Sequence, residues 1–157
     1  MVALWRIATD TPDYGADDLS GKGAEATGGR WNRQGVPMIY ASTSIALACL
    51  ETLVHLGGGH SLPLNRYLVR IEVPQEPWTS RTVFDAAGHA GWDAEPAGLV
   101  SQDWGTRWAQ AQGSLLAEVP SIVVREESNV LINPRRPDLV QLSAVRVRKW
   151  SYDPRLG

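Results

Sequence analysis

Three side chains that lie close together in the sequence could act on a dinucleotide. Arg30 follows two glycines, Tyr40 ends a short apolar run, and Glu51 lies in a segment with helical spacing. A guanidinium can bind a pyrophosphate through paired charge-assisted hydrogen bonds, and a phenol ring can stack on a flat heterocycle. A carboxylate can stabilise positive charge that develops on a sugar ring. If the fold brings the three together, their types indicate NAD chemistry.

Each candidate also has an ordinary structural role, which its type alone does not exclude. Arg30 in a glycine turn could pair with a surface acid, and Tyr40 at a strand end could be a half-buried core ring. Glu51 lies at the margin of an apolar helix face, where it could meet either a cleft or water. Ser121 and Asn129 complete the set, although a serine at a strand start often bonds the backbone. The residues by themselves leave these alternatives open.

The elements that must position these side chains are mostly strands. Apolar and β-branched runs predict strands at residues 4–8, 36–41, 67–73, 120–124, 129–133 and 145–150. Apolar residues at helical spacing predict one helix from the hydroxyl run at 42–44 to residue 56 and another over 98–112. Three glycines at 57–59 would stop the first helix, and segment 9–29 has loop composition. Strands with inserted helices predict an α+β domain.

Length and composition restrict the class of protein. The 157 residues allow one domain with a real core, and the formal net charge of −2 argues against a nucleic-acid surface. No apolar run approaches the ~20 residues of a membrane span, and the first residues lack a signal-peptide pattern. The single cysteine, Cys49, allows no intrachain disulfide and lies among apolar residues typical of an inert core thiol. We therefore expect a cytoplasmic protein.

Several standard kinds of site find no support in the sequence. It contains neither the glycine-rich fingerprint of a Rossmann or P-loop nucleotide site nor the nucleophile elbow of an α/β-hydrolase. His55, His60 and His89 lack the spacing of a zinc site and are expected at the surface, so we expect no metal. A ribonuclease is disfavoured because no histidine suited to general-base catalysis lies near basic residues.

The motifs around the candidate residues resemble those of a known family. Gly28-Gly29-Arg30-Trp31-Asn32, Tyr40-Ala41-Ser42 and Leu47-Ala48-Cys49-Leu50-Glu51 are similar to the signature of the RES-domain family. The likeness continues at residues 19–24, 120–121 and 129–134, whereas residues 75–113 carry little of it. The family is named for an arginine, a glutamate and a serine, and it supplies the toxins of Xre–RES toxin–antitoxin pairs.

The resemblance implies a fold, a substrate and a partner. The fold is like that of the ADP-ribosyltransferases, with a split, mainly antiparallel β core and flanking helices, as a single RES domain over residues 1–157. NAD is the implied substrate, with no prosthetic group, and family members either degrade it, in some cases with phosphate as acceptor, or transfer ADP-ribose to a protein. The implied partner is a helix-turn-helix antitoxin of the Xre type.

Six residues match positions that recur in the family. Arg30, Tyr40 and Glu51 match its active-site positions. Ser121 matches its signature serine, Asn129 a recurrent asparagine and Arg6 a common basic position, and we expect these three to take part in substrate binding.

The resemblance and the chemistry of the side chains together predict a reaction. Cleavage of the nicotinamide–ribose bond places positive charge on the sugar, which Glu51 would stabilise. Tyr40 would stack near the nicotinamide, Arg30 would bind a phosphate, and Ser121 would orient Glu51 or a ribose hydroxyl. We expect a toxin that consumes NAD by hydrolysis or phosphorolysis. ADP-ribosylation of a protein target and a non-enzymatic protein-binding module are the alternatives, and homo-oligomer formation stays open.

Overall fold

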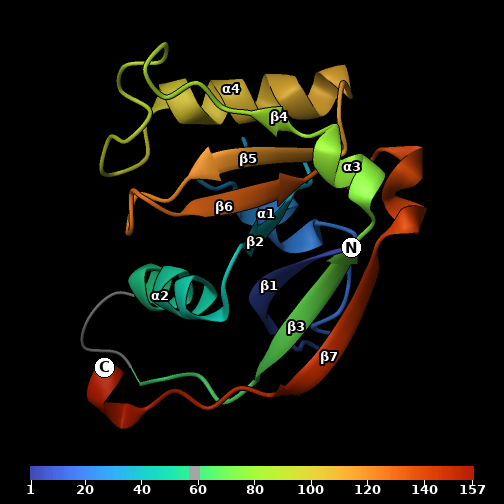
Figure 1. Cartoon of the computed structure of the whole chain (residues 1–157). Coiled ribbons are helices and arrows are strands. Elements are labelled where there is room, and N and C mark those ends of the chain that lie inside the picture. Colours follow the sequence, from blue (N-terminus) through green and yellow to red (C-terminus); the bar gives the residue numbers. More distant parts are fainter. Residues whose placement is uncertain (57–60) are drawn as a thin grey trace.

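A seven-stranded, mostly antiparallel sheet forms the frame of the molecule (Figure 1). The computed structural model describes residues 1–56 and 61–157. The strand order is β4-β5-β6-β2-β1-β3-β7, and β4 pairs in parallel with β5. The strands are β1 (Val2–Thr9), β2 (Ile39–Ser42), β3 (Arg66–Val73), β4 (Thr82–Val83), β5 (Leu116–Pro120), β6 (Ser128–Ile132) and β7 (Ser143–Lys149). The helices are α1 (Lys22–Thr27), α2 (Ile45–Leu56), α3 (Gln75–Thr79), α4 (Leu99–Ala111) and the 3-10 helices η1 (Pro137–Gln141) and η2 (Pro154–Leu156).

The sheet is split between β1 and β2. These strands share one paired position, Trp5 with Ser42, whereas β1 pairs with β3, and β2 with β6, along the whole strand. In Figure 1, β5 and β6 lie nearly across the view, while β1, β3 and β7 run steeply. The predicted α+β architecture, with a split, mainly antiparallel β core and flanking helices, is confirmed.

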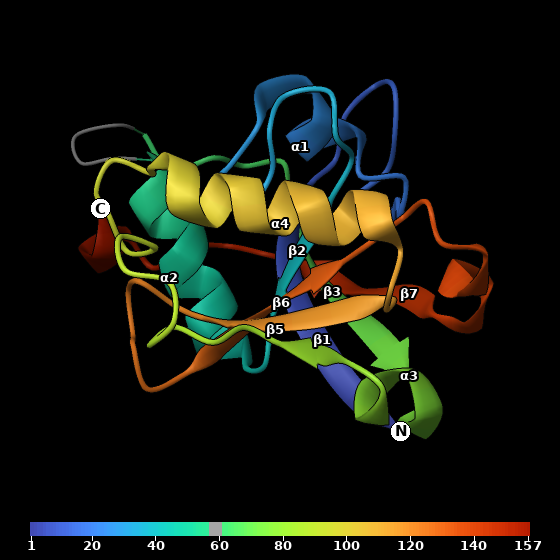
Figure 2. The ribbon, with the colours of Figure 1, turned by 90° about the horizontal axis from the view of Figure 1, so that it is seen from above.

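Two helices cover the same face of this split sheet. Alternation along β2 places Tyr40 and Ser42 on the face that also carries Trp5, the partner of Ser42 on β1. On this face α2 buries Ala48 against residues of β1 and β3, and α4 buries Trp108 against residues of β5 and β6. Figure 2 shows α4 crossing above β2 and β6, with α2 beside it. The end of β2 therefore lies between the two helices.

The helix α2 is anchored at its start and in its second half, on either side of Glu51. At its start the hydroxyl of Ser44 accepts the N–H of Leu47 at 3.1 Å, which is a helix cap. Farther along, the hydroxyl of Thr52 lies 2.8 Å from that of Tyr152, so the C-terminal segment of the chain is tied to the helix. Glu51 immediately precedes this second anchor and is half-buried.

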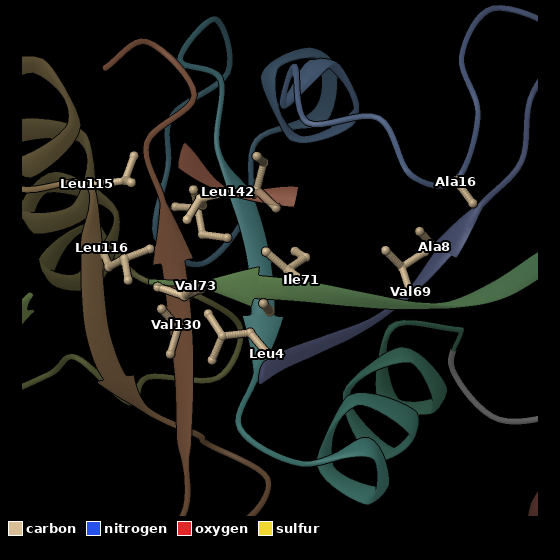
Figure 3. Packing of buried hydrophobic residues seen from close by; sticks show 13 residues of the cluster. Leu4, Ala8, Ala16, Val69, Ile71, Val73, Leu115, Leu116, Val130 and Leu142 are labelled. Atoms are coloured by element: carbon tan, nitrogen blue, oxygen red, sulfur yellow. The ribbon is translucent and has the colours of Figure 1, made fainter. Parts of the chain in front are cut away.

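The opposite face of the sheet carries the main hydrophobic core (Figure 3). Its buried strand residues come from both halves of the split sheet and include Leu4, Ile39, Ala41, Val69, Ile71, Val73, Leu116, Val130 and Ile132. Figure 3 shows Leu115 and Leu142 joining this cluster from outside the strands. Because the cluster spans both halves, it fixes β2 relative to β1, where the strands themselves share one paired position.

Most of the predicted elements are confirmed. The strands predicted at residues 4–8, 36–41, 67–73, 129–133 and 145–150 correspond to β1, β2, β3, β6 and β7, and the two predicted helices correspond to α2 and α4. The glycine stop at 57–59 and His60 lie outside the described residues. Within residues 1–56 and 61–157, none of the helices has the length and apolar character that crossing a membrane requires.

Two predictions of local structure are wrong. The segment 9–29, expected as a loop, contains α1, which is bounded by Gly21 and Gly28, both with positive φ. The strand expected at 120–124 lies instead at Leu116–Pro120 and shares only Pro120 with the prediction. It ends there because the hydroxyl of Ser121 accepts the N–H groups of Val123 and Val124, each at 3.0 Å, and turns the chain. The sequence also does not predict α3, β4, η1 or η2.

Close packing of α4 on the segment that carries Arg30 predicts a large effect of a small substitution. A β-carbon at Gly105 would lie 1.8 Å from the carbonyl oxygen of Trp31. Although alanine normally stabilises a helix relative to glycine, we expect Gly105→Ala to lower the free energy of unfolding by about 1–3 kcal/mol, because the helix must move away. Urea unfolding measures this, with Gly113→Ala as control, since a β-carbon there meets nothing within 4 Å. Equal stability of the two variants would contradict the packing.

Candidate active site

Glu51 has one carboxylate oxygen held from two sides. Its Oε1 accepts a hydrogen bond from the Ser121 hydroxyl at 2.7 Å and another from Nδ2 of Asn129 at 2.9 Å. Ser121 is fully buried where β5 ends, and Asn129 is half-buried on β6. Among the described residues, no hydrogen bond reaches Oε2. The carboxylate is therefore fixed through one oxygen, while the other has no hydrogen-bond partner among the described residues.

Tyr40 has its hydroxyl enclosed by the segment that follows Arg30. The hydroxyl accepts the N–H of Trp31 at 3.0 Å and donates to Oδ1 of Asn32. The Asn32 amide nitrogen donates to three backbone carbonyls, so its oxygen must be the atom that faces Tyr40. Burial raises the pKa of Tyr40, although the hydrogen bond from Trp31 and the charge of Arg30 oppose this. The phenol is therefore neutral and its hydroxyl is fully engaged.

Arg30 is held by elements that lie far from it in the sequence. Its backbone carbonyl accepts the hydroxyl of Ser101 on α4 at 2.9 Å. Its guanidinium donates to the carbonyls of Trp92 at 3.2 Å and Ala94 at 2.8 Å, and it forms an ion pair with Glu95 at 2.9 Å. The side chain of Arg30 is 14% exposed and that of Glu95 is 71% exposed. Pairing with a surface acid thus occurs here, and the acid is largely exposed.

A cavity of about 160 Å³ opens beside the split, between β1, the segment 14–24 and β2. Arg6 and Tyr40 both line it. Burial lowers the pKa of Arg6, while the negative charge of Asp18 in the same cavity opposes this. In the part of the chain that the structure describes, the guanidinium of Arg6 has no ion-pair partner. A half-buried guanidinium in a cavity is suited to binding an anionic group.

The structure brings the predicted residues into two neighbouring groups. Arg6 and Tyr40 line the cavity, and Glu51 is bonded to Ser121 and Asn129. The groups are adjacent because Ser42, which lies opposite Asn129, is two residues from Tyr40 on one face of β2, a spacing of about 7 Å. The charge of Arg30 acts on Tyr40, but no hydrogen bond joins Arg30 to Glu51 among the described residues. Convergence of these side chains on a bound NAD stays a prediction.

Two contributors to the site are not predicted from the sequence. Ser42 is expected as a helix-capping hydroxyl, but Ser44 provides the cap, and the hydroxyl of Ser42 donates to Oδ1 of Asn129 at 2.7 Å. Alternation along β2 is the signal that could have found Ser42, since it shares a face with Tyr40. The segment 92–95, which holds Arg30, lies where the chain resembles the family least, and it carries no comparable signal.

Other catalytic groups find little support in the structure. Residues 1–56 and 61–157 contain no group of three or more His, Cys, Asp or Glu side chains that could hold a metal ion. Cys49 is buried, and burial raises the pKa of its thiol, which disfavours the reactive thiolate. His55 is exposed, as expected, whereas His89 is half-buried against the ring of Phe84.

Comparisons with known proteins agree on one family. The RES domain pattern matches residues 3–155. A protein of Sphingobium sp. (strain YBL2) named Prs ADP-ribosylating toxin is 58% identical over 155 residues, which are 98% of this chain and 96% of that protein. A protein named Toxin Res from Yersinia enterocolitica serotype O:8 / biotype 1B is 38% identical over 144 residues, which are 91% of this chain and 93% of that protein.

A solved structure shares the fold. The crystal structure of the M. tuberculosis MbcT–MbcA toxin–antitoxin complex contains a similar chain, with a TM-score of 0.58 and 19% sequence identity. The match covers 94% of this chain and 84% of that chain, so the likeness extends over nearly the entire sheet and its helices. The domain pattern and the sequence relatives establish that the chain belongs to the RES-domain family.

Proposed function

We propose that this protein cleaves the nicotinamide–ribose bond of NAD and transfers the ADP-ribosyl group to the protein Prs. The name of the Sphingobium relative supports both reaction and acceptor, because the likeness extends over nearly all of both chains. The observation that carries the proposal is the Glu51 carboxylate, held through Oε1 by Ser121 and Asn129 while Oε2 has no hydrogen-bond partner among the described residues. A carboxylate fixed in advance can stabilise an oxocarbenium-like transition state without reorganising.

In this mechanism Glu51 acts on the charge that develops on the sugar. As the bond from the anomeric carbon to the pyridinium nitrogen breaks, its electron pair leaves with nicotinamide, which becomes neutral. The positive charge that appears on the ribose is stabilised by Oε2 of Glu51. A nucleophilic group of the acceptor then bonds to the anomeric carbon and releases its proton to solvent.

Three further side chains would bind and orient NAD. Arg6 would bind the pyrophosphate, because its guanidinium lines the cavity and has no ion-pair partner among the described residues. Arg30 would bind a phosphate oxygen by exchanging it for the exposed carboxylate of Glu95. Tyr40 would stack on the nicotinamide, with its ring fixed through the hydroxyl by the backbone of Trp31.

Analysis of the products tests this proposal and separates it from hydrolysis or phosphorolysis of NAD, for which water or phosphate would replace the protein acceptor. The purified protein is incubated with NAD alone, with added phosphate and with purified Prs, and the products are identified by mass. We expect nicotinamide release that depends on Prs and an increase in the mass of Prs by ADP-ribosyl groups. Free ADP-ribose or a phosphorylated product would identify the other acceptors. Without nicotinamide in any reaction, the protein would be a non-enzymatic binding module.

We also infer that the protein is the toxin of a toxin–antitoxin pair, with an antitoxin of the Xre helix-turn-helix type as its partner. The names of the Sphingobium and Yersinia relatives support the toxic role. Consumption of NAD or modification of Prs would account for toxicity. Copurification with a co-expressed antitoxin tests the partnership, and recovery of the protein alone would contradict it.

A further inference from the structure

Ser42 is connected to Glu51 through a single intervening side chain. Its hydroxyl donates to Oδ1 of Asn129 at 2.7 Å, and Nδ2 of the same amide donates to Oε1 of Glu51 at 2.9 Å. In the described part of the chain, no other group bonds the side-chain oxygen of Asn129. The orientation of this amide therefore depends on Ser42 at one end and on the carboxylate at the other.

The direction of each hydrogen bond in this connection follows from the chemistry of its groups. An ionised carboxylate can only accept, so Asn129 must turn its nitrogen toward Glu51. Its oxygen then faces Ser42, and because an amide oxygen can only accept, Ser42 must donate. Without the hydroxyl, the carboxylate alone restrains the amide, which can then rotate away from the geometry in which Nδ2 donates to Oε1. Glu51 would be held less firmly.

The register of the sheet places Ser42 where it can hold Asn129. Ser42 is the last residue of β2 and lies directly opposite Asn129 on β6 and Trp5 on β1. Directly opposed residues have their β-carbons about 4.5–5.5 Å apart, which suits a hydrogen bond between short side chains. Ser42 is 3% exposed, so bulk water has little access to replace its hydroxyl.

The other donor to Glu51 is oriented in a different way. The hydroxyl of Ser121 accepts the N–H groups of Val123 and Val124, which directs its single proton to the carboxylate. Backbone groups thus orient Ser121, whereas a side chain orients Asn129. A single substitution can therefore release one donor to Glu51 while leaving the other in place.

We propose that Ser42 is a positioning residue that acts on Glu51 through Asn129. This inference rests on the proposed cleavage of NAD, in which Glu51 stabilises the transition state. Ser42 holds the carboxylate and need not touch the substrate, so its loss affects turnover rather than binding. Kinetically this means a lower kcat with little change in KM.

Nicotinamide release by the full chain, with NAD and Prs, tests the role of Ser42. Ser42→Ala is expected to lower kcat about tenfold, with KM for NAD changed less than about twofold. Ser42→Thr keeps the hydroxyl and is expected to retain most of kcat. Thr43→Ala is the matched control. The hydroxyl of Thr43 donates to the backbone carbonyl of Ser128 at 3.1 Å, on the same strand as Asn129. Removal of this hydroxyl should leave kcat unchanged.

A double-mutant cycle separates action through Asn129 from a general structural role. In the Asn129→Ala background, Ser42→Ala is expected to have no further effect on kcat. Any of three results would overturn the proposal. The effects of the two substitutions on kcat could multiply, Ser42→Ala could keep the wild-type kcat, or its kcat could fall only in proportion to the fraction of unfolded protein. If the wild-type protein releases no nicotinamide, the proposed function fails and this inference fails with it. If the wild-type protein releases nicotinamide and Ser42→Ala has the wild-type kcat, this inference alone fails.

Discussion

Replacing Glu51 with glutamine is expected to slow nicotinamide release from NAD by about 10²–10³-fold while leaving the fold intact. The amide oxygen of glutamine can still accept the hydrogen bonds that Ser121 and Asn129 donate to Oε1. What the substitution removes is the negative charge next to the sugar, where positive charge develops. Steady-state kinetics of nicotinamide release, together with thermal unfolding, measure the two consequences separately.

The matched control for this substitution is Glu76→Gln, which also exchanges a carboxylate for an amide. Glu76 lies in the exposed first turn of α3 and forms no ion pair among the described residues. It should therefore have wild-type kinetics. Wild-type kinetics in Glu51→Gln as well would remove the carboxylate from the mechanism.

Arg30→Lys is expected to lower kcat/KM for NAD by about 10–100-fold, although it preserves the positive charge. A lysine has a point charge and cannot reproduce the forked donors of a guanidinium, with which Arg30 could bind a phosphate in place of Glu95 and still hold the carbonyls of Trp92 and Ala94. Each charge-assisted hydrogen bond that is lost costs roughly 1.5–3 kcal/mol. NAD titration by calorimetry and kinetics of nicotinamide release measure the loss in binding and in turnover.

Glu95→Gln shows whether Arg30 serves the substrate or the surface ion pair. If Arg30 binds a phosphate, Glu95 competes with NAD, and its neutralisation should lower KM by up to about twofold, because exposed ion pairs are weak. If Arg30 only holds the segment 92–95, Glu95→Gln should impair activity in the same direction as Arg30→Lys. That outcome, or unchanged kinetics in Arg30→Lys, would assign Arg30 to structure.

Local sequence patterns predict the elements whose burial is periodic. The strand β3 alternates because one of its faces packs into the core, and α2 combines a hydroxyl cap with apolar residues at helical spacing. By contrast, α1 has no buried residue, so no periodicity marks it, and two residues of β4 are too few for a pattern. The β-branched run after Pro120 suggests a strand, but the hydroxyl of Ser121 turns the chain there.

The residues of the candidate site could be predicted only through the family resemblance, because local sequence patterns do not show which distant residues come into contact. The hydrogen bonds to Glu51 join it to Ser121 and Asn129, which lie 70 and 78 positions away, and no local spacing reveals such contacts. The role of Ser42 follows from the register between β2 and β6, which appears only when the strands are paired. The carbonyls that hold Arg30 belong to an irregular segment, where any residue type presents the same backbone group.

Nicotinamide and modified Prs can be measured in one reaction, with the wild-type protein and with Glu51→Gln. If Glu51 stabilises the transition state of ADP-ribosyl transfer to Prs, the wild-type protein forms nicotinamide and ADP-ribosylated Prs in equal amounts, and both products fall together in the variant. Nicotinamide from Glu51→Gln at the wild-type rate, or from neither protein, would contradict this mechanism.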